Sequence, residues 1–147
     1  MALENTKYSL TIVPAAAGVT TLNGTTLDMA GFDGVVFALS VGTITETGTV
    51  TMKAQHSEDG SSWADVAGAT VSAADTNSDK LLLLEAVIPT KRYARCVVTR
   101  GVANSAIGGC VAGLYGRNRL HNTVSHDPAV AANNIATTAI NAKFLDV

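Results

Sequence analysis

Charged side chains are scarce in this sequence. Only 15% of the 147 residues are Asp, Glu, Lys or Arg, against about 25% in typical soluble domains, while 47% are hydrophobic. The apolar runs are short, as Leu81 to Leu84 shows, whereas a bilayer-spanning helix needs roughly 20 residues, so we expect no membrane span. Because monomers seldom leave broad apolar patches in water, we expect sister subunits or a partner lattice to cover part of the surface. A domain rich in Ala and Thr with a thinly charged surface is the alternative.

Recognisable catalytic and metal-binding patterns are also missing. No nucleophile elbow, P-loop or dinucleotide fingerprint occurs. The histidines lack the spacing of a metal site, and a weak metal site formed by His121 and His126 is the alternative. Cys96 and Cys110 lie in neighbouring strand-like segments, where a disulfide is conceivable if the segments form a hairpin. We expect buried thiols instead, because the cytoplasm is reducing. The sequence therefore predicts no enzyme, no cofactor and no metal.

The N-terminus does not have the pattern of a secretion signal. Glu4 stands where a signal would be basic, and Tyr8, Leu10 and Ile12 alternate with polar residues as in a strand. We therefore expect the protein to stay in the cytoplasm in which it is made.

Alternation of apolar and polar residues predicts short strands. Residues 35–41 and 50–54 each place apolar side chains on one face, and we expect these two segments to pair as a hairpin. Asp59-Gly60 can supply the positive φ angles of a tight turn, which predicts a second hairpin. In that hairpin we expect Trp63 to anchor the following strand on the core.

Further strand-like segments follow at spacings of about 10 residues. In the segment Lys80–Ile88, every residue after Lys80 is apolar except for one glutamate, which indicates a strand covered on both faces or an interface strand. Arg92–Arg100 and Ala106–Tyr115 complete the pattern. Seven or eight strands fit within residues 6–117, so the fold class is predicted to be all-β, a β-sandwich or jelly roll formed by residues 1–117.

Residues 118–147 follow a different pattern and predict an extended C-terminal arm. Their apolar residues recur about every five positions, which suits neither a helix nor a strand. A loosely folded end is the alternative, because termini often lack order. Large apolar side chains would be wasted on a solvated tail, so we expect an arm that lies across a neighbouring subunit. The residues expected to bind the partner are Ile135, Ile140, Phe144 and Leu145.

Basic residues are concentrated in one part of the chain. Six of the ten lie between Ala86 and His126, where there is no Asp or Glu: Lys91, Arg92, Arg95, Arg100, Arg117 and Arg119. Pairing with acids such as Asp59 or Asp65 ranks first, and docking to an acidic protein surface ranks second. Nucleic acid is a distant third, because only two tyrosines are available to stack on bases. For docking, the candidates are Arg92, Arg95, Arg117 and Arg119.

Four motifs follow one another over residues 31–117: GFDG at 31–34, GTIT at 42–45, QHSEDGSSWADV at 55–66 and KRYAR at 91–95. Their order resembles a group of small virion proteins of tailed bacteriophages. The resemblance implies a capsid decoration (cement) protein, or else a neck or tail component, whose loops and terminal arms clamp coat subunits. It further implies a location in the virion, a homo-oligomeric state, and the major capsid protein or other virion subunits as partners.

A second resemblance involves the same motifs. Ser-x-Asp-Gly-x-x-Trp followed by Arg-Tyr-x-Arg is also similar to discoidin-like, galactose-binding-like sandwiches, which would imply a carbohydrate-binding or lipid-binding module. Such modules usually present aromatic side chains on their loops, and only 5% of this chain is aromatic. We therefore place the virion role first.

Overall fold

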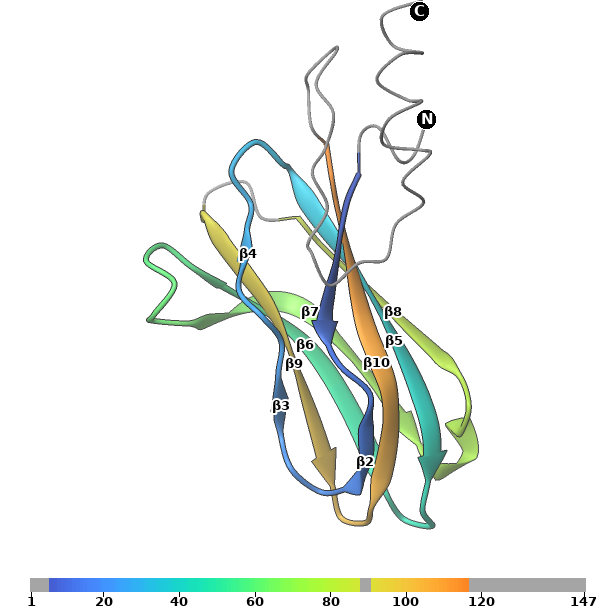
Figure 1. The fold of residues 1–147 in the computed structure, drawn as a ribbon. Helices are drawn as coiled ribbons and strands as arrows, with labels where there is room; N and C mark the ends of the chain where they lie inside the picture. The colour runs from blue at the N-terminus through green and yellow to red at the C-terminus, as the bar shows by residue number, and fades with distance from the viewer. Residues whose placement is uncertain (1–5, 88–90, 117–147) are drawn as a thin grey trace, which may run out of the picture.

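The computed structural model describes residues 6–87 and 91–116, which form two antiparallel sheets packed face to face (Figure 1). Sheet A contains β1 (Lys7–Ile12), β2 (Ala15–Gly18), β5 (Gly34–Ile44), β8 (Leu81–Val87) and β10 (Ser105–Tyr115). Sheet B contains β3 (Leu22–Asn23), β4 (Leu27–Asp28), β6 (Thr49–Ser57), β7 (Ala64–Ala74) and β9 (Tyr93–Gly101). One turn of 3-10 helix, η1 (Asp75–Asn77), precedes β8.

The strand orders are β1-β10-β5-β8 in sheet A and β3-β9-β6-β7 in sheet B, with β2 also beside β10 and β4 also beside β9. The β-sandwich prediction is confirmed. The described residues contain ten strands rather than seven or eight, because residues 7–28 break into four short ones. Pro14, which has no amide hydrogen for a ladder, separates β1 from β2 along the same edge of β10.

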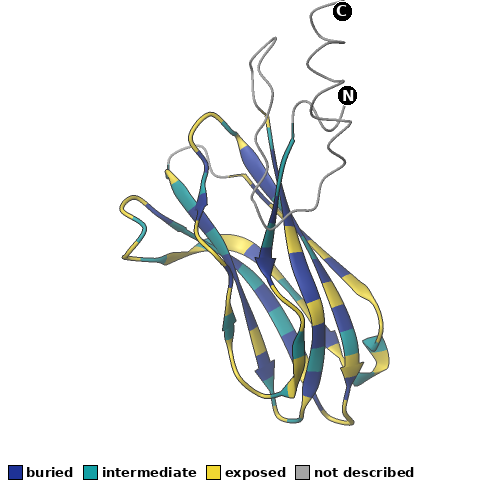
Figure 2. Cartoon of the chain, in the orientation of Figure 1, coloured by how far each residue is buried: buried dark blue, intermediate teal, exposed yellow. Residues whose placement is uncertain are grey.

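Period-two alternation places the core between the sheets, as the banded strands in Figure 2 show. The largest fully buried hydrophobic side chains are Phe37, Leu39, Met52, Leu114, Val35, Val50 and Val98. All core residues lie between Ile12 and Leu114, so the described sandwich contains its own hydrophobic core. The predicted boundary after residue 117 and the C-terminal arm lie outside the described residues and stay predictions.

The predicted hairpin between residues 35–41 and 50–54 is wrong. These segments belong to β5 and β6, and β5 pairs with β10 and β8 while β6 pairs with β7 and β9. The two apolar faces meet across the sandwich instead of lying side by side. A turn at Thr45–Gly48, with Gly48 N donating to Thr45 O at 2.7 Å, takes the chain from one sheet to the other.

The two cysteines are close together, but they are not ladder partners. Cys96 is in β9 of sheet B and Cys110 is in β10 of sheet A, so they face each other through the core, with 3.8 Å between their sulfur atoms. Both are fully buried. The hydrogen bond to Cys110 and burial raise the pKa of the Cys96 thiol, which keeps this side chain protonated as a packing group.

The apolar segment 80–88 forms an edge strand with one covered face. Leu82 and Leu84 point into the core, whereas Leu81 and Leu83 are more than half exposed, so the prediction of a strand covered on both faces is wrong for the described residues. Its role as an interface strand stays a prediction. None of the described helical residues forms a segment long and apolar enough to cross a membrane.

Candidate interaction surfaces

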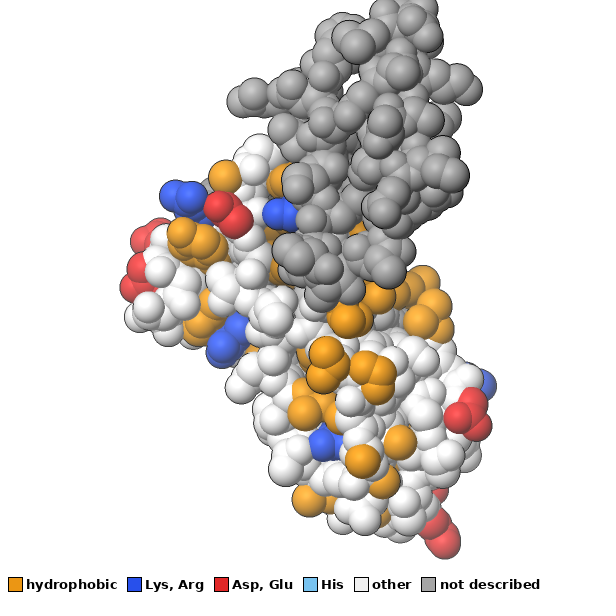
Figure 3. Space-filling view, in the orientation of Figure 1, with side chains coloured by type: hydrophobic (Ala, Val, Ile, Leu, Met, Phe, Trp, Pro, Cys, Tyr) orange, Lys and Arg blue, Asp and Glu red, His pale blue; other side chains and the backbone are white. Residues whose placement is uncertain are grey.

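The outer face of sheet A is apolar across several strands. On β8, Leu81, Leu83 and Val87 are 58%, 59% and 61% exposed, and on β10 Val111 is 41% exposed. Figure 3 shows hydrophobic side chains gathered over this sheet, with most charged side chains toward the margins of the view. Apolar side chains from two strands are therefore exposed on this face among the described residues.

The free edge of β8 adjoins this surface. Among the described strands, β8 hydrogen-bonds only to β5, so its other edge presents unpaired backbone groups. Natural proteins usually protect such edges with proline, lysine or a bulge. Leu81–Val87 contains no proline or lysine and only one charged side chain, Glu85, and its pairing with β5 runs without a register shift. This edge is therefore able to pair with another strand.

A groove of about 430 Å³ lies on the same outer face. Side chains from four strands line it, among them Tyr8, Val36, Ala38, Glu85, Val111 and Tyr115. Glu85 is the one charged residue among the lining groups. The Tyr115 hydroxyl donates to the Glu85 carboxylate, and this hydrogen bond together with burial raises the pKa of Tyr115 to about 12. An apolar ligand or segment fits this groove better than a charged one.

The outer face of sheet B carries a polar network instead. Thr51 bonds Ser72 at 3.0 Å across β6 and β7. Lys53 donates to Asp65 at 3.1 Å, and Gln55 donates to the same carboxylate at 2.8 Å. These two hydrogen bonds lower the pKa of Asp65, with the bond from Gln55 the larger cause. The two sheets of one molecule therefore have opposite outer surfaces, polar on sheet B and apolar on sheet A.

Several residues of the basic window have partners within the fold. Arg92 donates twice to Asp28, at 3.0 and 3.2 Å, and this pair lowers the pKa of Asp28. Lys91 pairs with Glu58. Pairing with acids is thus confirmed for these two, although Asp28 and Glu58 are the partners rather than Asp59 or Asp65.

Arg100 is part of the scaffold. It is 5% exposed and donates to the carbonyl oxygens of Ala16, Thr20 and Ser105 at 2.7 to 3.0 Å, which ties the β2–β3 turn to the end of the sandwich. Its guanidinium is therefore not a docking group. Arg117, Arg119, Ile135, Ile140, Phe144 and Leu145 lie outside the described residues, and their binding role stays a prediction, as does that of Arg92 and Arg95.

Trp63 is not a core residue, which corrects the sequence prediction. It lies in the connection before β7 and is only partly buried, with the Arg95 guanidinium 4.4 Å from its ring centroid. Arg95 also donates to Gln55 at 2.9 Å. A tryptophan that follows a turn can pack on a neighbouring arginine as well as on the core, and its place after the turn does not distinguish the two.

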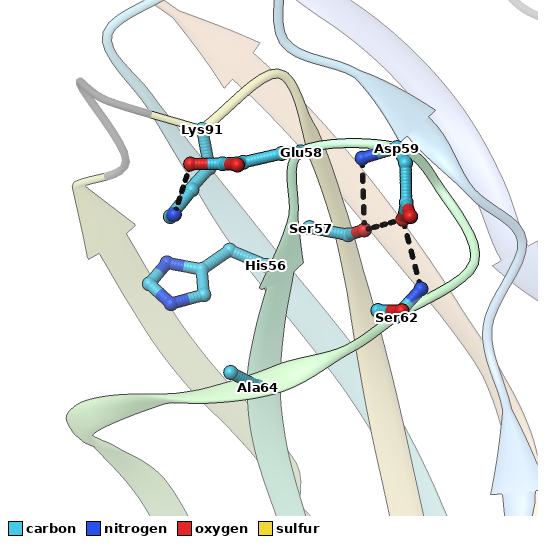
Figure 4. Close-up of a pocket in the computed structure, with 7 residues that line it drawn as sticks. All are labelled: His56, Ser57, Glu58, Asp59, Ser62, Ala64 and Lys91. Atoms are coloured by element: carbon cyan, nitrogen blue, oxygen red, sulfur yellow. Dashed lines mark hydrogen bonds and ion pairs between the residues drawn. The ribbon is translucent and has the colours of Figure 1, made fainter.

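A small polar pocket of about 230 Å³ lies beside the β6–β7 turn (Figure 4). The Asp59 carboxylate accepts from Ser57 Oγ at 2.9 Å and from the backbone amides of Ser61 and Ser62 at 2.8 Å. These bonds lower the pKa of Asp59 to about 2. Gly60 has φ +78, so the predicted Asp59-Gly60 turn is confirmed.

The hydrogen bonds of the polar pocket hold the β6–β7 turn. Of the two serines that line the pocket, Ser57 donates its hydroxyl to the turn carboxylate, and His56 bonds to no hydroxyl in the described part of the chain. A nucleophile needs a base within hydrogen-bond reach. No group of three or more His, Cys, Asp or Glu side chains able to hold a metal occurs among the described residues.

Part of the apolar surface was absent from the sequence predictions. The partner-binding residues expected from the sequence do not include three residues that line the groove: Val36, Ala38 and Val111. The signal was present at residues 35–39, where five consecutive apolar residues replace strict alternation and so place hydrophobic groups on both faces of β5.

Comparison with known proteins shows a shared fold only. No protein-family model and no curated protein matches the chain. Among solved structures, the PBSX exported protein XepA has a TM-score of 0.56 at 15% identity, covering 87% of this chain and 42% of XepA. The chain thus spans less than half of XepA. Two further structures have lower TM-scores. The SPBc2 prophage-derived protein YomS has a TM-score of 0.46 at 12% identity, covering 76% of this chain and 95% of YomS. A xylan-binding CBM 22 domain has a TM-score of 0.46 at 10% identity, covering 76% of this chain and 88% of that domain.

Two truncations distinguish the core from the surface tryptophan. We expect Phe37→Ala to lower the free energy of unfolding by about 3 to 5 kcal/mol, because it leaves a cavity between the sheets. Trp63→Ala should lower it by only about 1 to 2 kcal/mol, since it removes partial burial and one cation–π contact. Chemical denaturation of both variants checks this, and equal losses would place Trp63 back in the core.

The Asp59 turn predicts a pH-dependent contribution to stability. Its folded pKa of about 2 lies below the ordinary 3.8, so the ionised carboxylate stabilises the fold above pH 3.8, and this contribution disappears as the pH falls toward 2. Asp59→Asn should therefore melt at a lower temperature than the wild type at pH 7, and the difference should shrink between pH 4 and pH 2. Thermal melts followed by circular dichroism measure it. A difference that stays constant over this range contradicts the assignment.

Proposed function

We propose that the chain is a structural protein of a tailed-phage virion, a capsid decoration (cement) protein that binds and stabilises the head lattice. The observation that carries the proposal is the apolar outer face of sheet A beside the free edge of β8. A sandwich exposed to water on both sides would carry polar residues on both outer faces, as sheet B does. An apolar patch on the outer face of a sheet marks an interaction site.

The energetics favour the apolar face over the basic patch as the source of binding. Covering a leucine or valine contributes about 1.5 to 3 kcal/mol when burial is complete. Exposed ion pairs such as Arg92–Asp28 contribute about 0 to 1 kcal/mol and are already formed within the chain. A protein that binds only the assembled lattice adds its binding free energy to that lattice, which is how a cement protein reinforces a head.

The C-terminal arm is part of this proposal. Deleting residues 118–147 should leave a folded sandwich, because the core lies between residues 12 and 114. We expect the shortened chain to bind heads at least about tenfold more weakly, since the arm's contacts with neighbouring subunits are lost. Heads made without this protein, mixed with purified full-length or shortened chain, allow both affinities to be measured. The control is full-length Val102→Lys, which changes an 80% exposed residue in the β9–β10 loop. Unchanged affinity of the shortened chain would remove the arm from the proposal.

Copy number separates a head lattice or a tail tube, which both need hundreds of copies, from the neck. Mass spectrometry of virions should give hundreds of copies for a head lattice protein, and heads that carry the chain should release DNA at a higher temperature than heads that lack it. About six to twelve copies would favour the alternative role, a neck component. A chain absent from virions would overturn the proposal.

A carbohydrate-binding module is the second candidate, because Trp63 is partly exposed, with Arg95 stacked on one face of its ring. A partly exposed tryptophan beside polar side chains is a typical platform for a sugar ring. The test is a glycan array with wild type and Trp63→Ala. Binding that the variant loses would favour this candidate, and an array without signal for the wild type counts against it.

A further inference from the structure

We propose that, in the free protein, residues 118–147 occupy the groove on the outer face of sheet A of their own chain. The inference rests on the proposed function, because it names what covers the same face before the protein meets a particle. Its test needs no particle.

The described chain ends at the rim of this groove. Tyr115 lines the groove, and the next residue, Gly116, is the last one described. Asp33 N donates to Tyr115 O at 2.9 Å, which fixes the point of exit. Gly116 has φ +84, a conformation that residues with a Cβ rarely adopt, so the backbone changes direction there. The described part of the chain therefore ends beside the groove.

The chemistry of the segment matches that of the groove. Residues 118–147 contain Ile135, Ile140 and Phe144, and their two basic and two acidic residues cancel. The groove offers Val36, Ala38 and Val111. A segment with large apolar side chains and no net charge gains more from an apolar groove than from water.

The space and the reach also fit. Gly113 keeps the floor of the groove open, because a Cβ there would lie 3.2 Å from Thr6 and 3.3 Å from Tyr8. Four neighbouring strands spaced about 4.8 Å apart make the outer face of sheet A about 15 Å wide. Thirty residues span up to about 100 Å when extended, so the segment can cross the face and return.

Tethering decides which chain supplies the segment. A segment attached at the rim meets its own groove at an effective concentration of about millimolar, far above the concentration of other copies in dilute solution. On a particle, where copies are crowded, the same contacts can be exchanged between neighbours, as in domain swapping. Occupation by the same chain in the free protein is therefore compatible with an arm that clamps neighbours on the head.

A synthetic peptide of residues 118–147 tests the proposal. It should bind the chain shortened to residues 1–117 and should not bind the full-length chain, whose groove is filled. In the shortened chain, Val111→Lys should weaken binding by about tenfold or more, because it places a charge in the apolar groove. The matched control, Val102→Lys at the far end of the sandwich, should leave it unchanged. Calorimetry measures each affinity, and light scattering should show a monomeric full-length chain.

Several outcomes would overturn the proposal. A peptide that binds neither form, that binds both alike, or that is equally sensitive to both lysine variants would show that the groove is not its site. An oligomer that dissociates when residues 118–147 are removed would show that the segment is exchanged between copies even without a particle.

The shortened chain exposes its apolar face and can aggregate, so a second measurement uses the full chain. Amide hydrogen exchange over residues 130–145 should be slowed about tenfold or more in the wild type and in Val102→Lys, and should be fast in Val111→Lys. Fast exchange in the wild type overturns the proposal. Failure of the proposed function is seen separately: a chain that fills its own groove but ignores heads refutes only the decoration role.

Discussion

A two-layer sandwich hides only one face of each sheet, and this constraint governs the rest of the structure. Phe37 and Leu39 of β5 fill the layer between the sheets, where they are fully buried. The outer faces must then be polar or be covered by something else. The outer face of sheet B is polar, with Lys53 bonded to Asp65. The outer face of sheet A exposes Leu83 on β8 and therefore needs to be covered.

Period-two alternation predicts which face a residue takes, but not which strand lies beside it. For residues 35–41 and 50–54, alternation predicted the correct inward faces. The predicted hairpin between them is wrong, because a connection of the same length can either cross between sheets or turn within one sheet. Cys96 and Cys110 illustrate the same limit, since their proximity was expected along a ladder and arises through the core. The fold class and the Asp59-Gly60 turn were predictable because both depend on local signals.

The candidate surface was predictable only in part, for a related reason. Low charge indicated that some surface is covered, and the segment 80–88 was marked as a possible interface. Val36 and Val111 reach the same face from strands that are distant in sequence, and only the order β10-β5-β8 brings them together. Trp63 was expected to anchor the strand after the Asp59-Gly60 turn on the core, and the competing contact with Arg95 depends on β9 lying beside β6.

The sandwich fold alone does not distinguish a capsid partner from a sugar, because one fold can carry many unrelated functions. The chemistry of the two outer faces does bear on the choice. A sugar site needs an open aromatic ring and spare hydrogen-bonding groups, but Arg95 covers one face of Trp63, and the Gln55 amide both donates to Asp65 and accepts from Arg95. These groups on sheet B are already used within the protein. The apolar side chains on sheet A have no such internal partner among the described residues, so the driving force for association lies on that side of the molecule.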